Sequence, residues 1–268
     1  MRSRMTAMAR PGRGCGPAVL VGTGRGRAYD GHMKRPVLLV LLVLITVAAV
    51  VAVWWSGRQP APEGAVNDVK PFQYQADTRP TVEVYGDSIS QGDSSNFSSG
   101  NTGPTSWVSH LGGPDGLRFV GGYARPGMKM TEAASEASNI VVPQQTASTV
   151  VVELGTNDIN TGGEWSDFAE ALEDFTSHLD VEPSGIVVVG VGPIDRLDPD
   201  AIAAWNERTQ DLADEKGWLY VWPFSDLTDA DGYWVPEYTE DGLHPNKSGA
   251  QVLGANMAEE VRAALAER

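Results

Sequence analysis

From residue 81 onward, short apolar segments typical of strands alternate with longer segments of helical periodicity. The strongest strand signals are residues 149–154 and 186–190, which are dominated by valine and other β-branched residues. The other expected strands are 81–85, 119–120 and 219–221, and the expected helices are about 164–179, 198–216 and 247–267. Strands that are apolar on both faces and separated by helices form a parallel sheet covered on both sides. The fold is therefore predicted to be α/β, with a parallel five-stranded sheet.

This architecture also predicts where a ligand binds. In open parallel sheets, ligands bind beyond the carboxyl ends of the strands. Ser88 follows the first expected strand and Asn157 follows the third. Both side chains are therefore expected at one edge of the sheet.

A different kind of segment precedes this body. Residues 37–53 carry no charge, with Lys34 and Arg35 before them and Trp54 and Trp55 after them. Roughly 20 apolar residues in a helix span a bilayer, a basic flank stays inside, and tryptophans favour the outer interface. We expect a transmembrane signal-anchor over residues 36–55, with the catalytic domain outside the cell membrane.

The rival interpretation is a cleaved signal peptide, after which the protein is secreted. Such peptides usually have a shorter apolar region and small residues at the cleavage site, so we favour the anchor. The basic N-terminal segment, residues 1–35, contains Met33, which is a plausible alternative start directly before Lys34. Residues 56–80 are proline-rich and predict a linker, and residues 81–268 form the expected hydrolase domain.

The charge of the chain limits its partners. Eight Arg or Lys residues lie within residues 1–35, so the remainder is more acidic than the net charge of −15 of the whole chain. An acidic surface repels nucleic acid, and no nucleic-acid partner is expected. Cys15 is the only cysteine, which excludes an intrachain disulfide and a cysteine nucleophile in the body.

Ser88 is the candidate nucleophile. Gly86 permits a sharp turn after the strand, so that the serine opens the next helix with its hydroxyl and its backbone N–H both facing the cleft. An ordinary helix N-cap serine explains the same residue, because serine is a preferred cap.

Asp241 and His244 supply the other parts of a serine hydrolase. A serine needs a base, and a carboxylate holds a neutral imidazole in one tautomer. Their spacing of three residues on a turn brings the two side chains together, and Pro245 ends that turn. A polar loop without chemistry is the alternative, since Asp-Gly and His-Pro are common turn pairs.

Two further residues suit the stabilisation of an oxyanion, which acyl transfer develops in its transition state. The side-chain amide of Asn157, in Gly155-Thr156-Asn157-Asp158, is one candidate donor, although an Asn-Asp turn explains it equally. The backbone N–H of Gly127 is the other.

Taken in order, Gly86-Asp87-Ser88, Gly127, Gly155-Thr156-Asn157-Asp158 and Asp241-Gly242-Leu243-His244-Pro245 resemble the SGNH (GDSL-type) hydrolase family. The resemblance implies a flavodoxin-like three-layer α/β/α sandwich and a triad of Ser88, His244 and Asp241. It implies an oxyanion hole of the Ser88 N–H, the Gly127 N–H and the Asn157 side chain. No cofactor and no metal are implied.

We therefore expect an extracytoplasmic serine esterase that hydrolyses carboxylic, short-acyl esters through an acyl-enzyme. Acyl transfer to cell-envelope glycans and a non-catalytic binding module are the alternatives. Three segments are expected to shape the pocket: the polar, flexible loop 92–106, the aromatic segment 233–238 and residues 194–196. The aromatic residues of segment 233–238 fit a core role equally well.

Overall fold

The computed structural model describes residues 44–48, 77–113, 116–141 and 147–267. The chain divides into two units, Met1–Tyr74 and Gln75–Arg268. In the first, residues 44–48 are helical, and most of the expected signal-anchor and linker lies outside the described residues. Among the residues that the structure describes, no helix is long and apolar enough to cross a membrane. The signal-anchor stays a prediction.

The second unit is built on a parallel sheet of five strands in the order β2-β1-β3-β4-β5. Its strands are β1 (Thr81–Gly86), β2 (Arg118–Ala124), β3 (Thr149–Glu153), β4 (Ile186–Val189) and β5 (Leu219–Val221). This is the flavodoxin-like strand order. The predicted α/β fold with a parallel five-stranded sheet is confirmed.

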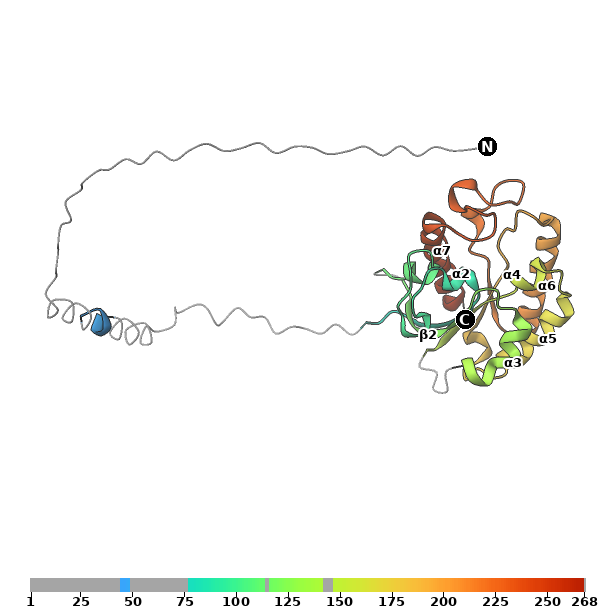
Figure 1. Ribbon diagram of the computed structural model, residues 1–268. Coiled ribbons are helices and arrows are strands. Elements are labelled where there is room, and N and C mark those ends of the chain that lie inside the picture. The colour runs from blue at the N-terminus through green and yellow to red at the C-terminus, as the bar shows by residue number, and fades with distance from the viewer. Residues whose placement is uncertain (1–43, 49–76, 114–115, 142–146, 268) are drawn as a thin grey trace, which may run out of the picture. The chain divides into compact units, whose positions relative to one another are not determined.

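Helices cover both faces of the sheet (Figure 1). One face packs against α3 (Met130–Ile140), α5 (Trp165–Thr176) and α6 (Pro199–Lys216). The other packs against the short α2 (Ser88–Gln91) and the long α7 (Lys247–Ala266). A further short helix, α4 (Thr156–Asn160), follows β3, and single turns of 3₁₀ helix lie at Phe97–Ser99, Trp107–His110, Pro183–Gly185, Ser225–Leu227 and Pro236–Tyr238.

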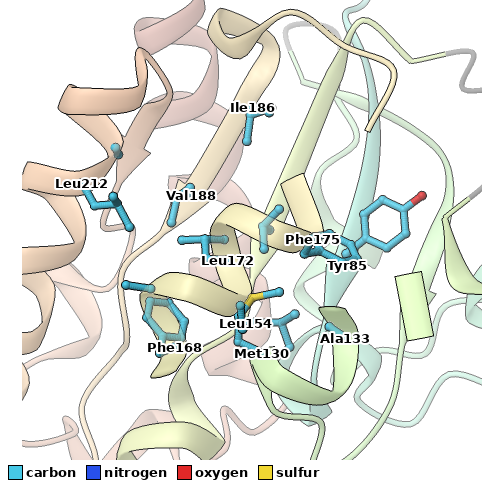
Figure 2. Packing of buried hydrophobic residues seen from close by; sticks show 14 of the residues in the cluster. Tyr85, Met130, Ala133, Leu154, Phe168, Leu172, Phe175, Ile186, Val188 and Leu212 are labelled. Atoms are coloured by element: carbon cyan, nitrogen blue, oxygen red, sulfur yellow. The ribbon is translucent and has the colours of Figure 1, made fainter. Parts of the chain in front are cut away.

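The alternation of side chains along the strands produces two cores. In β3, Val150 and Val152 join the cluster under α3, α5 and α6, while Val151 joins the cluster under α7. Phe175 of α5 is completely buried in the first cluster (Figure 2). Truncating such a side chain to alanine typically costs about 3–5 kcal/mol of stability. Both faces of β3 are therefore buried, as its run of valines predicts.

Two elements differ from the sequence predictions. Strand β2 spans seven residues instead of the two predicted, because Gly121 and Gly122 interrupt the apolar pattern. Gly122 has φ +133°, and a Cβ at this position would collide with the backbone of Val84 in β1. Glycine is needed there because the two backbones approach closely. Helix α3 was not predicted, since two of its four buried residues are alanines, Ala133 and Ala137, which give little hydrophobic signal.

The strand order places the site. The chain leaves β1 toward β2 on one side and returns to β3 on the other, so the order reverses between β1 and β3. A crevice forms at such a reversal, beyond the carboxyl ends of the strands. Ser88 follows β1 and Asn157 lies in α4, directly after β3.

Candidate active site

Ser88 is the first residue of α2, immediately beyond the carboxyl end of β1. The turn into the helix requires Gly86, since a Cβ there would overlap the side chain of Ser90. Asp87 is the N-cap, and its Oδ1 accepts a hydrogen bond of 2.8 Å from the backbone N–H of Ile89. The capped turn leaves Ser88 half-buried at the edge of the sheet.

The Ser88 hydroxyl lies next to the His244 ring. The distance from Ser88 Oγ to His244 Nε2 is 2.8 Å, and that from His244 Nδ1 to Asp241 Oδ2 is 2.7 Å. An ionised carboxylate only accepts hydrogen bonds, so Nδ1 carries the proton and Nε2 is left to accept from the serine. The structure thus brings together the three residues predicted from sequence, in the order that a serine hydrolase uses.

Asp241 is organised by its own turn. Its Oδ1 accepts from the backbone N–H groups of Leu243 (3.0 Å) and His244 (2.8 Å). Partial burial acts to raise the pKa of Asp241, but the hydrogen bonds from the His244 ring and from these backbone groups outweigh it. They hold the pKa below its usual value. The Asp241 carboxylate therefore remains charged at neutral pH.

The loop that carries Asp241 and His244 is held in place by Asp195, which lies in the segment after β4. The backbone N–H of Asp195 donates to the carbonyl of Gly242 (2.9 Å), and Asp195 Oδ1 accepts from the N–H of Trp234 (2.9 Å). Gly242 has φ +70°, and a Cβ there would overlap the Asp195 carboxylate. Only glycine fits at this contact, so Asp195 fixes the position of the turn.

The candidate oxyanion donors lie on three loops. Gly127, at φ +75°, occupies the turn after β2, and Ser88 and Asn157 follow β1 and β3. Within the described residues, neither the Ser88 N–H nor the Gly127 N–H donates to a protein acceptor. The Asn157 amide is different: its Nδ2 donates to Asp87 Oδ2 (2.9 Å) and to the carbonyl of Met128 (3.1 Å). Two of the three candidate donors are thus without a protein acceptor, and the third is engaged.

A buried acidic network, to which the sequence patterns assign no role, lies beneath the serine. Asp87 is 0 % exposed and Glu153 is 3 % exposed. Ser90 Oγ donates to Glu153 Oε2 (2.7 Å) and accepts from Trp107 Nε1 (3.0 Å). The sequence signal for this buried network is Glu153 itself, which is a charged residue at the end of an apolar strand.

Burial dominates the titration of these acids. It raises the pKa of Asp87 to about 7, against hydrogen bonds from Ile89 and Asn157 and the charge of His244. Burial, together with the charge of Asp87, raises the pKa of Glu153 well above its usual value. Burial also raises the pKa of Asp158 to about 6; this residue accepts from the N–H of Met130 at the start of α3.

A cavity of about 730 Å³ opens in front of Ser88, within the range typical of ligand pockets. Most of its lining residues are polar: Ser88, Gly92, Asp93, Thr105, Glu240, Asp241, His244, Pro245, Asn246 and Lys247. Of the predicted pocket segments, loop 92–106 contributes Gly92, Asp93 and Thr105. Asp93 Oδ1 accepts from the Thr105 hydroxyl (2.7 Å) and its N–H (2.9 Å), so these contacts close the loop at its base.

Segments 233–238 and 194–196 do not line this cavity. Trp234 is 2 % exposed, and its indole N–H donates to the carbonyl of Pro193, so it belongs to the core. Ile194 is buried, and the Arg196 guanidinium donates to Asn160. Their predicted role in shaping the pocket is wrong for this cavity; both segments instead support the loop that carries His244.

No group of three or more His, Cys, Asp or Glu side chains that could hold a metal ion occurs in the part of the chain that the structure describes. The candidate residues contact one another, backbone groups and the Asp87 carboxylate. The arrangement is that of a nucleophile, a base and a group that orients the base.

Comparison with known proteins gives a family and a fold. The sequence matches the GDSL-like lipase/acylhydrolase family over residues 84–252. A search of curated proteins found no match. Among solved structures, the esterase EstA of Pseudoalteromonas sp., inhibited by monoethylphosphonate, is similar with a TM-score of 0.54 at 15% identity, covering 69% of this chain and 98% of EstA. A mutant of Axe2, an acetyl-xylooligosaccharide esterase from Geobacillus Stearmophilus, gives 0.53 at 17%, covering 68% and 94%. At these identities the two structures support the fold alone.

Proposed function

Because this chain belongs to the GDSL-like lipase/acylhydrolase family and is a serine hydrolase acting on esters, we propose that Ser88, His244 and Asp241 form its catalytic triad. The observation that carries the proposal is the 2.8 Å contact between Ser88 Oγ and His244 Nε2. Asp241 holds the opposite ring nitrogen at 2.7 Å. A serine that is only a helix cap has no need of either contact.

The reaction proceeds in two steps. Ser88 Oγ attacks the ester carbonyl while His244 Nε2 takes its proton, and the alcohol leaves with that proton. Water, activated by the same nitrogen, then releases the acid from the acyl-enzyme. Asp241 remains ionised throughout and stabilises the imidazolium.

The oxyanion of the tetrahedral intermediate is stabilised by the backbone N–H groups of Ser88 and Gly127 and by the amide of Asn157. The two backbone donors lack a protein acceptor within the described residues, which leaves them available. One such donor typically contributes about 10²–10³-fold to kcat.

The favoured substrates are short-acyl esters of hydrophilic alcohols. Apart from Gly92 and Pro245, every residue lining the cavity has a polar or charged side chain. A long acyl chain is best accommodated by large apolar side chains, and none is among the described residues that line this cavity. Axe2, which shares the fold, is an acetyl-xylooligosaccharide esterase, and an acetylated glycan suits this lining.

We place the chemistry outside the cell membrane, on the strength of residues 37–53. A stretch of this length without charge, flanked by Lys34 and Arg35, fits an N-terminal anchor with its basic end inside.

The test is hydrolysis of p-nitrophenyl acetate and p-nitrophenyl octanoate by the full chain and its Ser88→Ala variant. We expect the acetate to be preferred, and kcat/KM of the variant to fall by about 10⁵–10⁶-fold. Ser99→Ala, an exposed serine outside the cavity, is the matched control and should retain full activity. Activity retained by Ser88→Ala contradicts the nucleophile assignment. Product analysis with sugar acceptors separates hydrolysis from acyl transfer, and a folded chain without turnover indicates a binding module.

A further inference from the structure

Asp87 precedes the proposed nucleophile and has no part in the triad, yet both oxygens of its buried carboxylate make defined contacts. Oδ1 accepts from the N–H of Ile89 at 2.8 Å, which caps α2. Oδ2 accepts from Nδ2 of Asn157 at 2.9 Å. The same side chain therefore fixes the turn that presents Ser88 and the amide of a residue on another loop.

The Asn157 amide extends this link to the third loop. Its second hydrogen is donated to the carbonyl of Met128 at 3.1 Å, and Met128 directly follows Gly127. The loops after β1, β2 and β3, which carry the three proposed oxyanion donors, are thus joined through one carboxylate and one amide. If the oxyanion accepts a hydrogen bond from Asn157, it shares the N–H hydrogen that is donated to Met128 at 3.1 Å. The bond to Asp87 at 2.9 Å then keeps the amide in place.

The contacts of Asp87 and the electrostatics of its neighbour Glu153 together indicate which of the two buried acids carries charge. Both oxygens of Asp87 accept from N–H groups, which suits an ionised carboxylate. Glu153 lies nearby, where two like charges repel strongly, and burial together with the charge of Asp87 raises the pKa of Glu153 well above its usual value, which favours its protonated form. The other titratable groups that act on Asp87 are Asp158 of α4 and His244.

We propose that Asp87 is a positioning residue of the oxyanion hole, and that its carboxylate acts on the reaction rate by orienting the Asn157 amide. This inference rests on the proposed function, because it assumes that Asn157 stabilises the oxyanion. Charge-assisted hydrogen bonds are roughly twice as strong as neutral ones, which makes a buried carboxylate an effective anchor for an amide.

The variant Asp87→Ser separates the two contacts of Asp87. Serine is itself a good N-cap, so α2 keeps an acceptor for the Ile89 N–H, but its short side chain cannot reach Asn157. We expect kcat to fall by about 10–100-fold and KM to change by less than about 3-fold, because an interaction made in the transition state is weakened.

A double-mutant cycle with Asn157→Ala tests whether Asp87 acts through Asn157. Asn157→Ala alone should lower kcat by about 10²–10³-fold. The double variant should lie within about 3-fold of Asn157→Ala, since an absent amide needs no orientation. Losses that multiply would show that Asp87 acts independently, and a fully active Asp87→Ser would also overturn the inference.

Two controls keep the outcomes distinct. Thermal unfolding of each variant establishes that it is folded, and Asp87→Asn replaces Asp87→Ser in the cycle if the serine variant does not fold. Asparagine preserves the shape and caps the helix, but it has only one acceptor oxygen for the two N–H groups. An active Ser88→Ala enzyme refutes the proposed function itself. Full kcat in Asn157→Ala refutes the assumption on which the Asp87 inference rests, and the inference falls with it.

Discussion

Asp241 and Asp87 are two carboxylates beside the same serine, and they lie in opposite environments. The Asp241 side chain is 54% exposed and contacts the ring of His244 on an external turn. Asp87 is 0 % exposed and contacts backbone and amide N–H groups beneath α2. Each accepts two or more hydrogen bonds, so hydrogen bonding alone does not distinguish them.

Solvation does distinguish them. Partial burial acts to raise the pKa of Asp241, but its hydrogen bonds from the His244 ring and from backbone N–H groups together outweigh burial and hold the pKa below its usual value. The pKa of Asp87 is raised to about 7, because burial outweighs its hydrogen bonds. An exposed carboxylate can therefore supply permanent charge to the histidine, whereas a buried one is better suited to hold geometry.

The largest effect that separates the two carboxylates is expected at the exposed one. In Asp241→Asn, the amide NH₂ faces His244 Nδ1 and favours the tautomer whose Nε2 carries the proton. That nitrogen cannot then accept the proton of Ser88. We expect kcat to fall by about 10²–10⁴-fold, as measured with p-nitrophenyl acetate.

The stability of Asp241→Asn should hardly change, since surface substitutions usually lie within about 0.5 kcal/mol. Asp211→Asn, an exposed carboxylate on α6, is the matched control and should affect neither property. A large loss of stability with unchanged kcat in Asp241→Asn would mean that Asp241 has a structural role and not a catalytic one.

A smaller effect is expected from the buried acids Asp87 and Glu153, which make the free energy of unfolding depend on pH. The pKa of Asp87 rises from 3.8 to about 7 on folding, so at intermediate pH the folded chain binds more protons than the unfolded chain. The contribution of such a group to the free energy of unfolding therefore falls as the pH rises from about 4 to 7. Glu153, with a raised pKa of its own, acts in the same direction.

Glu153→Gln removes one of these acids and should make this dependence shallower. Relative to the unmodified chain, the variant should be more stable at pH 8 than at about pH 5.5, as measured by urea unfolding. The lower value stays above the isoelectric point of about 4.6. Glu207→Gln, an exposed residue of α6, is the control. Parallel stability curves for Glu153→Gln and the unmodified chain would mean that Glu153 keeps its ordinary pKa.

An element of the fold could be predicted from sequence where its own residues carry the signal, and not where its structure depends on contacts with distant residues. Strands β3 and β4 were recognised because buried valine runs carry their own signal. Helix α3 was missed because its burial rests partly on alanines, and β2 was shortened because Gly121 and Gly122 serve a contact with β1 that no local pattern records. Close approach between strands is a tertiary property, and it overrides local pattern.

The site shows the same contrast. Asp241 and His244 could be paired from sequence because three residues separate them, and chemistry then called for Ser88. A role for Asp87 could not be predicted from sequence, because its partner Asn157 is 70 residues away on another loop. For segment 233–238 the sequence left a pocket role and a core role equally open, because it could not show that Trp234 is buried in the core.

The most direct test of the account is covalent labelling of the full chain with a fluorophosphonate, followed by peptide mapping. A fluorophosphonate traps an activated serine, and the 2.8 Å contact between Ser88 and His244 predicts one adduct, on Ser88. The adduct should be absent in Ser88→Ala and should form more slowly in Asp241→Asn. An adduct on another residue, or ester hydrolysis by a chain that is not labelled, would contradict the assignment of Ser88 as the nucleophile.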